Sequence, residues 1–482
     1  MSNQSVQFDP ISALLGEDQQ NKKHESDQQK AKKPNHDEIP QWRDVRRETP
    51  TFVREKDQVS KIKIISFFAL LGIGFLIGLL FFLRPSVSET EKRELTPFPS
   101  LTWSSFWSGD FTKEVSVWYA DTYPLREGMI RASQTMKTAY GIQSVSIKIT
   151  EHGEDIPTEI PDDIDQYIKD HESETDQPVN PVEGQTINNL YVSGDTAYEL
   201  YAFNTTAALK YAQAINKAAE ALSGKAQVYN VLVPLSYSIN LPESTATSLG
   251  ASSAKDAIRY IFSVVGDNVR KVQILDELTN HKDEYLYFRT DHHWTALGAY
   301  YAYVCVCQEM GMSPMVLSDY RTTNEIPGFL GTLYADAGQP ASLKSNPDTV
   351  VTFKPNSTND IIHYDGNGTK YTTYGIINGV SKTSNKYLTF LGGDFAYSEI
   401  HNPDKHDGSS VLLVKESFGN AFAPFLVDSF EYVYIVDYRY YKEMTLAQLV
   451  DTKGIQKVII LNNLVATTAT ARINELNAFF GS

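Results

Sequence analysis

The run Ile64–Leu83 constrains the chain most, because its 20 residues include no charged side chain and match the length of a helix that crosses a bilayer. A secretory signal peptide is the alternative, but the 63-residue leader and the lack of an Ala-x-Ala site disfavour it. Six basic residues lie shortly before the run and three follow it closely. This bias predicts a single-pass transmembrane helix over residues 64–84, with the N-terminus in the cytoplasm and residues 85–482 outside.

The two sides of this run differ in composition and charge. Residues 1–63 are rich in Gln, Lys, Asp, Glu and Asn and poor in apolar residues, which predicts a disordered cytoplasmic tail. They hold 12 of the 43 Lys and Arg residues and 11 of the 59 Asp and Glu residues, so residues 64–482 carry a net charge of −17. A nucleic-acid partner needs a basic face, so we predict none.

Further domain boundaries follow from local patterns. Residues 85–150 carry apolar residues at helical spacing, and residues 151–186 hold twelve Asp and Glu against one Lys, which predicts a helical juxtamembrane segment and an acidic loop. Strands then alternate with helices over residues 187–482. The predicted strands include 228–234, 272–275, 387–391, 411–414, 432–436 and 458–461. This alternation predicts a three-layer α/β/α domain with a mainly parallel sheet, interrupted by an insertion at about 320–386.

The most reactive run of side chains is Asp291-His292-His293-Trp294. It follows an aromatic stretch at 284–288, which predicts a short strand, and precedes an apolar helix at 296–310. Ligands gather at such strand-to-helix turns in α/β sheets. If the turn is extended, Asp291 and His293 face the same way and His292 turns aside. A carboxylate that orients an imidazole supplies two of the three groups of a hydrolase triad.

Ser417 is the candidate for the third group. An apolar strand at 409–415 precedes it, and an apolar helix at 421–427 follows it. In this position the hydroxyl lies at the sheet edge, and free N–H groups of the helix N-terminus can stabilise an oxyanion. Gly419 permits a close backbone approach. The alternative is that Ser417 is only an N-cap, which is the commonest role of serine at a helix start.

The run Thr290–Thr295 resembles the DHHW protein family, which is related to the alginate O-acetyltransferase proteins of the SGNH-hydrolase-like group. In those proteins an Asp-x-His pair precedes the serine along the chain, and Asp291, His293 and Ser417 match this order. The resemblance covers about residues 64–482. Its other blocks are 94–99, 123–126, 328–334, 390–393 and 436–441.

The resemblance implies an SGNH-like domain that transfers an O-acyl group, in particular acetyl, to or from a surface or secreted polysaccharide. It implies Ser417 as nucleophile, His293 as base and Asp291 as the residue that orients the base. It also implies a membrane partner of the membrane-bound O-acyltransferase type, and no cofactor. Two alternatives stay open: an esterase that uses water as acceptor, and a glycan-binding or assembly subunit with a silent triad.

Four more residues are candidates for substrate binding. His292 and Trp294 suit a cleft rim that binds sugars, although a buried tryptophan is more often part of the core. Arg439 suits a carboxylate or phosphate of a glycan, or else a structural pair with Asp437. Asp394 stands where the resemblance implies an amide, and an ionised carboxylate cannot donate to an oxyanion. A metal site is disfavoured, because adjacent histidines rarely address one ion.

Overall fold

The computed structural model describes residues 61, 63–69, 72, 75–76, 84–85, 87–88, 93–108, 110–125, 128–129, 132, 153–175, 189–365, 368–371, 375–379 and 384–481. The chain divides into two compact units, Met1–Gly72 and Ile73–Ser482. Nearly all of the predicted tail and much of the predicted anchor lie outside the described residues, although 63–69 are helical. Among the described helices, none is both long enough and apolar enough to cross a membrane.

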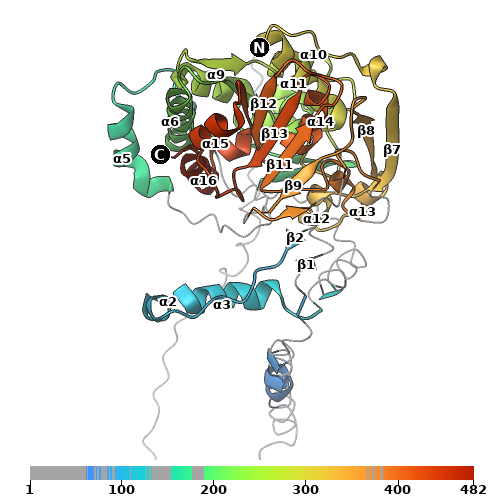
Figure 1. Cartoon of the computed structure of the whole chain (residues 1–482). Coiled ribbons are helices and arrows are strands. Elements are labelled where there is room, and N and C mark those ends of the chain that lie inside the picture. Colours follow the sequence, from blue (N-terminus) through green and yellow to red (C-terminus); the bar gives the residue numbers. More distant parts are fainter. Residues whose placement is uncertain are drawn as a thin grey trace, which may run out of the picture. The chain divides into compact units, whose positions relative to one another are not determined.

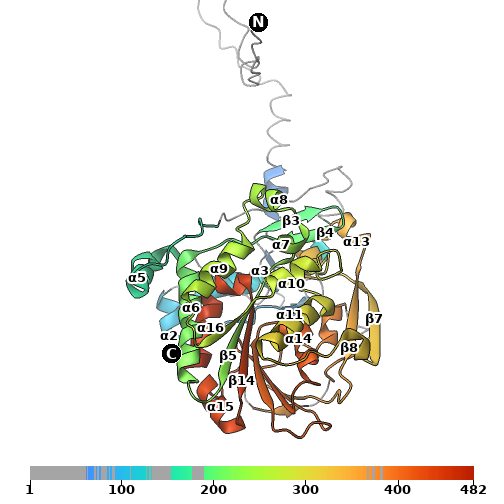
Figure 2. The ribbon, with the colours of Figure 1, turned by 90° about the horizontal axis from the view of Figure 1, so that it is seen from above.

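An eight-stranded sheet forms the centre of the second unit (Figures 1 and 2). Its strands in spatial order are β10 (Lys370–Tyr371), β9 (Ile362–Tyr364), β11 (Tyr397–His401), β13 (Tyr432–Asp437), β12 (Ser410–Lys415), β14 (Lys457–Asn463), β5 (Gln227–Val233) and β6 (Val269–Val272). The five strands from β13 to β6 are parallel, and the other three pair antiparallel. The parallel order predicted from the sequence therefore holds for one part of a mixed sheet.

The central strands are apolar along almost their whole length. All six residues of β12 are buried, as are six of seven in β5 and in β14. Leu413 pairs with Ile435 of β13 and with Ile459 of β14, so rows of branched side chains run across the sheet. Continuous apolar runs of this kind belong to strands that are covered on both faces.

Helices cover both faces of this sheet, which gives three layers (Figures 1 and 2). One face carries α6 (Thr205–Ala221), α9 (Ala254–Val264), α15 (Leu446–Lys453) and α16 (Thr470–Phe480), and the other carries α11 (Ala296–Glu309) and α14 (Gly419–Leu426). Side chains at the N-caps fix several starts: Asn204 caps α6 and Thr295 caps α11 through the backbone N–H three residues on. The described part of the chain is a mixed α/β fold.

The chain order places the last strand in the middle of the sheet. β14 lies between β12 and β5, and it pairs in parallel with both. The connection from β12 to β13 runs through α14 on one face, whereas the connection from β13 to β14 runs through α15 on the other. A change of direction of this kind opens a crevice at the carboxyl ends of the strands.

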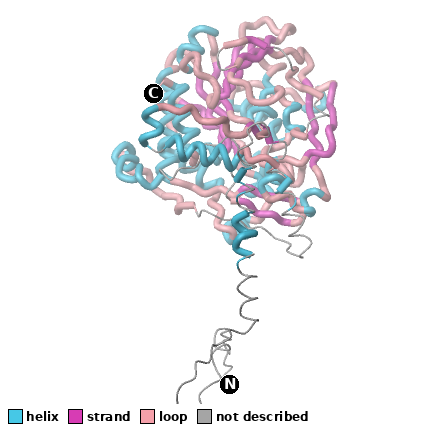
Figure 3. Tube along the Cα trace, turned by 90° about the horizontal axis from the view of Figure 1, so that it is seen from below, coloured by secondary structure: helices cyan, strands magenta, loops and turns pink. Residues whose placement is uncertain are grey.

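Shorter elements complete the fold. They are β1 (Val87–Ser88), β2 (Arg93–Glu94), α2 (Trp103–Ser108), α3 (Asp110–Asp121), α5 (Ile164–Thr175), β3 (Leu190–Ser193), β4 (Thr196–Glu199), α7 (Ser236–Asn240), α8 (Glu243–Ser248), α10 (Leu275–Asn280), η2 (Leu317–Asp319), β7 (Thr322–Phe329), α12 (Thr332–Asp336), α13 (Ala341–Lys344), β8 (Asp348–Lys354), η3 (Lys386–Thr389) and η4 (Leu464–Thr467). The β7–β8 pair of the predicted insertion forms one side of this unit (Figure 3).

Three local predictions differ from the structure. The stretch 387–391 forms the helical turn η3 instead of a strand, because Asn385 caps the N–H of Tyr387. In 284–288 only Tyr287 makes a strand-like bridge, to Trp294. Within the predicted acidic loop lies α5, because Ile168 packs into the main core while Asp165 and Asp170 are exposed to solvent.

Candidate active site

Ser417 lies in the tight turn between β12 and α14. The carboxylate of Glu416 accepts hydrogen bonds from the Phe418 N–H and from the Asn463 N–H at the end of β14, both at 3.0 Å. Gly419 is required here, since a Cβ at this position would lie 2.4 Å from the Cβ of Lys415. The turn is therefore fixed from two strands at once.

The N–H groups at the start of α14 are not free, which corrects the expectation that they would stabilise an oxyanion. The Phe418 N–H donates to Glu416, and the Gly419 N–H donates to the Glu416 carbonyl oxygen at 2.9 Å. The Asn420 N–H donates to the Ser417 carbonyl oxygen at 3.1 Å. These bonds shape the turn, and each occupies a donor that was predicted to face the substrate.

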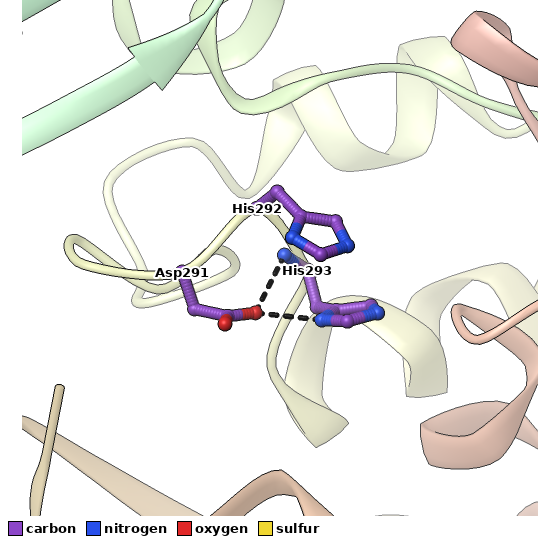
Figure 4. A group of neighbouring side chains, drawn as sticks. All are labelled: Asp291, His292 and His293. Carbon is purple, nitrogen blue, oxygen red and sulfur yellow. Dashed lines mark hydrogen bonds and ion pairs between the residues drawn. The ribbon is translucent and has the colours of Figure 1, made fainter. Parts of the chain in front are cut away.

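Asp291 and His293 are brought together by a turn in which the side chain caps the backbone (Figure 4). Oδ1 of Asp291 accepts from the His293 backbone N–H at 3.1 Å and lies 2.6 Å from the ring Nδ1 of His293. Oδ2 accepts from the N–H of Thr332 at 2.9 Å. Gly331 allows this approach, because a Cβ there would lie 2.3 Å from the Asp291 side chain. The pairing was predicted, but the extended backbone used to predict it was wrong.

A second ring nitrogen of His293 reaches the serine. His293 Nε2 lies 2.7 Å from Ser417 Oγ. Tyr387 stacks on the imidazole with ring centres 3.9 Å apart, and its hydroxyl donates to the Ser417 carbonyl oxygen at 3.0 Å. We call the chain of bonds Asp291–His293–Ser417 the relay. The structure thus brings together the three residues predicted to be catalytic.

The electrostatics keep the acid of the relay ionised. Burial by itself would raise the pKa of Asp291, but the electrostatic interactions with the rings of His293 and His292 and the hydrogen bonds from His293 and Thr332 outweigh it. The pKa of Asp291 is therefore held well below its ordinary value. An ionised carboxylate at Nδ1 fixes the tautomer that leaves Nε2 as an acceptor toward Ser417.

The sequence predicted that His292 turns aside, and the structure contradicts this prediction. Its ring centre lies 3.9 Å from that of His293, and its Nδ1 lies 2.5 Å from Thr332 Oγ1 (Figure 4). The side chain is buried, and burial together with the charge of His293 lowers its pKa to about 3. His292 therefore remains neutral at physiological pH.

Asp291, His292 and His293 also come within 4.8 Å of one another, a spacing that a metal ion could use. However, Oδ1 of Asp291 and Nδ1 of His293 already bond to each other. Nδ1 of His292 is engaged by Thr332, and Nε2 of His293 by Ser417. The donor set is thus occupied by hydrogen bonds in the arrangement of a proton relay.

Trp294 lies in the core, with none of its surface exposed. Its indole N–H donates to the Phe418 carbonyl oxygen at 2.9 Å. A side chain without exposed surface cannot stack on a sugar, so the structure contradicts the predicted rim role. Trp294 instead ties the turn that carries His293 to the turn that carries Ser417.

Arg439 and Asp394 belong to a group of two cations and two anions, of which Lys415 and Asp437 are fully buried. Lys415 Nζ lies 2.9 Å from Asp394 and 3.0 Å from Asp437, and Arg439 Nη2 lies 2.8 Å and 2.6 Å from the same two carboxylates. We call Lys415, Arg439, Asp394 and Asp437 the ion quartet. It corresponds to the structural pair left open for Arg439, extended by one further ion of each sign.

Asp394 connects the quartet to the helix that follows the turn of Ser417. Its Oδ1 accepts from the side-chain amide of Asn420, in the first turn of α14, at 2.7 Å. Burial would raise the pKa of Asp394, but the charges of Lys415 and Arg439 hold it well below its ordinary value. Asp394 is therefore an anion, and it cannot replace the amide donor that the resemblance implies.

Several residues that shape the site were missed in the sequence. Lys415 and Glu416 lie between an apolar strand and an apolar helix. Two adjacent charged residues at such a junction were a signal that their side chains have partners in the site. Tyr387 and Thr332 gave none, because only the fold brings them to the motif. Glu199, at the end of β4, is also buried, and its burial, followed by the charges of Asp336, Glu416 and Asp291, raises its pKa to about 8.

The fold is mixed α/β. At the carboxyl edge of its sheet, Asp291, His293 and Ser417 follow one another in a Ser-His-Asp arrangement. The family model described as DHHW protein matches residues 91–177 and 160–436. The chain therefore belongs to the DHHW protein family. No curated protein matches it.

Several solved structures are similar to this chain. A DHHW family protein from Eubacterium siraeum is 29% identical, with a TM-score of 0.54 over 60% of this chain and 96% of that one. PatB1 from Bacillus cereus, described with a sulfonyl adduct, is 19% identical, with a TM-score of 0.50 over 59% and 97%. The O-acetyltransferase domain of Pseudomonas putida AlgJ is 13% identical with a TM-score of 0.34 over 60% and 98%, too distant to carry an argument.

Proposed function

We propose that the chain is an O-acyltransferase, in particular an acetyltransferase, that acts on a polysaccharide through Ser417, His293 and Asp291. The observation that carries this proposal is the continuous relay, with contacts of 2.6 Å and 2.7 Å that end on a serine hydroxyl. Distances of this size place a nucleophile, a base and the residue that orients the base within reach of one another.

The geometry supports a two-step reaction. His293 Nε2 takes the proton of Ser417 Oγ while the oxygen attacks the acyl carbon of an ester, and the proton then passes to the leaving alcohol. This leaves an acyl-serine. In the second step a sugar hydroxyl gives its proton to His293 and attacks the acyl carbon, and Ser417 regains a proton as it leaves. Water in place of the sugar would give an esterase.

The test combines labelling with turnover. A sulfonyl fluoride should modify the wild-type chain at Ser417, and mass spectrometry should locate the adduct there. Ser417→Ala should abolish both labelling and turnover of a chromogenic acetyl ester, and it should melt within a few degrees of wild type. A glycan acceptor added to the assay distinguishes transfer from hydrolysis. Full activity in Ser417→Ala would refute the assignment, and a silent wild type would favour the binding-subunit alternative.

We further propose that the domain acts outside the cell, anchored by residues 64–84, with acyl groups delivered by a membrane-bound O-acyltransferase partner. The charge bias around the apolar run supports this orientation. Protease added to intact cells should digest epitopes within residues 85–482 and spare an epitope in residues 1–63. Protection of the large domain would contradict the proposed topology.

A further inference from the structure

Two permanent cations, Lys415 and Arg439, belong to the ion quartet next to the turn that carries Ser417, and both are neutralised by carboxylates. Lys415 contacts Asp394 and Asp437, and Arg439 contacts the same pair. Arg439 uses Nε and Nη2 on Asp437 in a bidentate pair, at 2.8 Å and 2.6 Å. The charge of a cation held in this way is neutralised by its carboxylate partners, so it attracts an incoming anion only weakly.

Asp394 is the member of the quartet that reaches the surface. Its side chain is 26% exposed, compared with 13% for Arg439 and 1% for Lys415. A ligand that approaches the quartet therefore meets a carboxylate before it meets either cation. A carboxylate accepts hydrogen bonds from hydroxyl and ammonium groups, and it repels other carboxylates and phosphates.

Three carboxylates act on the ring that stacks on the base. Burial, together with the charges of Asp291, Glu416 and Asp394, raises the pKa of Tyr387 well above its ordinary value. Tyr387 stacks directly on His293, so the same charges reach the base. Residues 64–482 also carry a net charge of −17, and a field of one sign lowers the local concentration of ligands of that sign.

We propose that the glycan accepted at this site is neutral or cationic, such as a plain hexose or amino-sugar polymer, and that uronate and phosphate polymers are rejected. This inference rests on the proposed function and specifies its substrate class. Hydroxyl groups of a sugar, or the ammonium of an amino sugar, bind the exposed oxygens of Asp394. The paired state of Arg439 removes it as the carboxylate or phosphate clamp that the sequence left open.

The test uses the full chain in detergent micelles, with a chromogenic acetyl ester as donor. Cello-, glucosamine and uronate oligosaccharides of equal length serve as acceptors, and acetyl transfer is measured at low and high salt. The neutral and cationic acceptors should exceed the uronate by about tenfold or more in kcat/KM at low salt. Added salt should raise the uronate rate, leave the neutral rate flat and lower the glucosamine rate.

Two variants that each remove one negative charge test whether Asp394 causes the difference in rate between acceptors. Asp394→Asn should narrow the gap between the neutral and uronate acceptors several-fold. Asp267→Asn should leave the gap unchanged, because Asp267 is fully exposed and precedes β6 at the opposite edge of the sheet. Since Asp394→Asn also disturbs the quartet, the salt dependence of the wild-type protein provides a test without any substitution.

One result would overturn the inference alone: a uronate acceptor that is preferred and slows with salt. In that case the chromogenic ester is still turned over, acetyl is still transferred to an acceptor and Ser417 is still labelled, so the proposed function survives. Ester hydrolysis that no acceptor of any charge alters would contradict the transferase proposal together with the inference, and it would favour the esterase. If the ester is not turned over and Ser417 is not labelled, the proposed function fails and the inference falls with it.

Discussion

The relay and the ion quartet both contact the segment of Ser417 and Asn420, and they use charge in opposite ways. The relay is open: one anion, Asp291, leads through His293 to a hydroxyl that can lose its proton. The quartet is closed: two cations and two anions satisfy one another. An open line can pass a proton on, whereas a closed group holds the geometry of its surroundings and presents the carboxylate of Asp394 at the surface. Activity and stability should therefore respond differently to substitutions in the two groups.

The largest effect is expected from breaking the relay at its base. His293→Ala should lower ester turnover by several orders of magnitude, about as far as Ser417→Ala, with no further loss in the double variant. His292→Ala should retain measurable turnover, because His292 bonds to Thr332 and not to the serine. The rate of ester turnover, measured for both variants at equal concentrations of folded protein, tests this prediction. An active His293→Ala beside an inactive His292→Ala would reverse the assignment.

A substitution in the quartet should act first on stability. Lys415→Met leaves Asp394 and Asp437 with only Arg439, and an uncompensated buried charge costs about 3–5 kcal/mol in the free energy of unfolding. Adding Asp394→Asn restores the charge balance and should recover part of this loss. Urea unfolding measures both variants.

Lys225→Met is the matched control for this comparison. Lys225 forms an equally short ion pair with Asp451, at 2.6 Å, but both side chains are about half exposed. Its loss should cost less than about 1 kcal/mol. Equal unfolding midpoints for Lys415→Met and the control would show that the quartet does not support the fold.

Glu199 offers the most selective effect, because it belongs to neither group and acts only through pH. Its pKa is raised to about 8, whereas an unfolded Glu titrates near 4.3. The folded chain thus binds the extra proton between these values, and stability falls as the pH rises from about 4 to 8. Glu199→Gln should remove this slope and be more stable at pH 8 by on the order of a few kcal/mol. Equal slopes for this variant and the exposed Glu220→Gln, from melts at pH 5 and 8, would contradict the assignment.

Much of this arrangement could be predicted from the sequence, for identifiable reasons. The strands β5, β12, β13 and β14 are apolar along their length, so their pattern alone located them. The relay could be predicted because Asp291 and His293 are two residues apart and Ser417 stands at a strand-to-helix turn.

The rest depends on contacts between distant segments. Nothing local in the sequence pairs Lys415 with Asp394, or places Tyr387 on His293. The extended turn was wrong because the backbone of His293 bonds to the side chain of Asp291, and local bonds of this kind override the alternation of a strand. Trp294 was placed at the rim because its type suits sugars, while its burial depends on the packing of Phe418 and Phe422.

The central position of β14 affects how the chain folds during its synthesis. This strand ends at Asn463 and joins the half of the sheet that holds β5 to the half that holds β12, and Asn463 also fixes Glu416 beside Ser417. A nascent chain that has emerged only as far as α15 already contains every residue of the relay, yet it lacks the strand that unites the two halves. Pairings between segments so far apart in sequence form slowly. Biosynthesis itself thus delays assembly of the relay until β14 has been added.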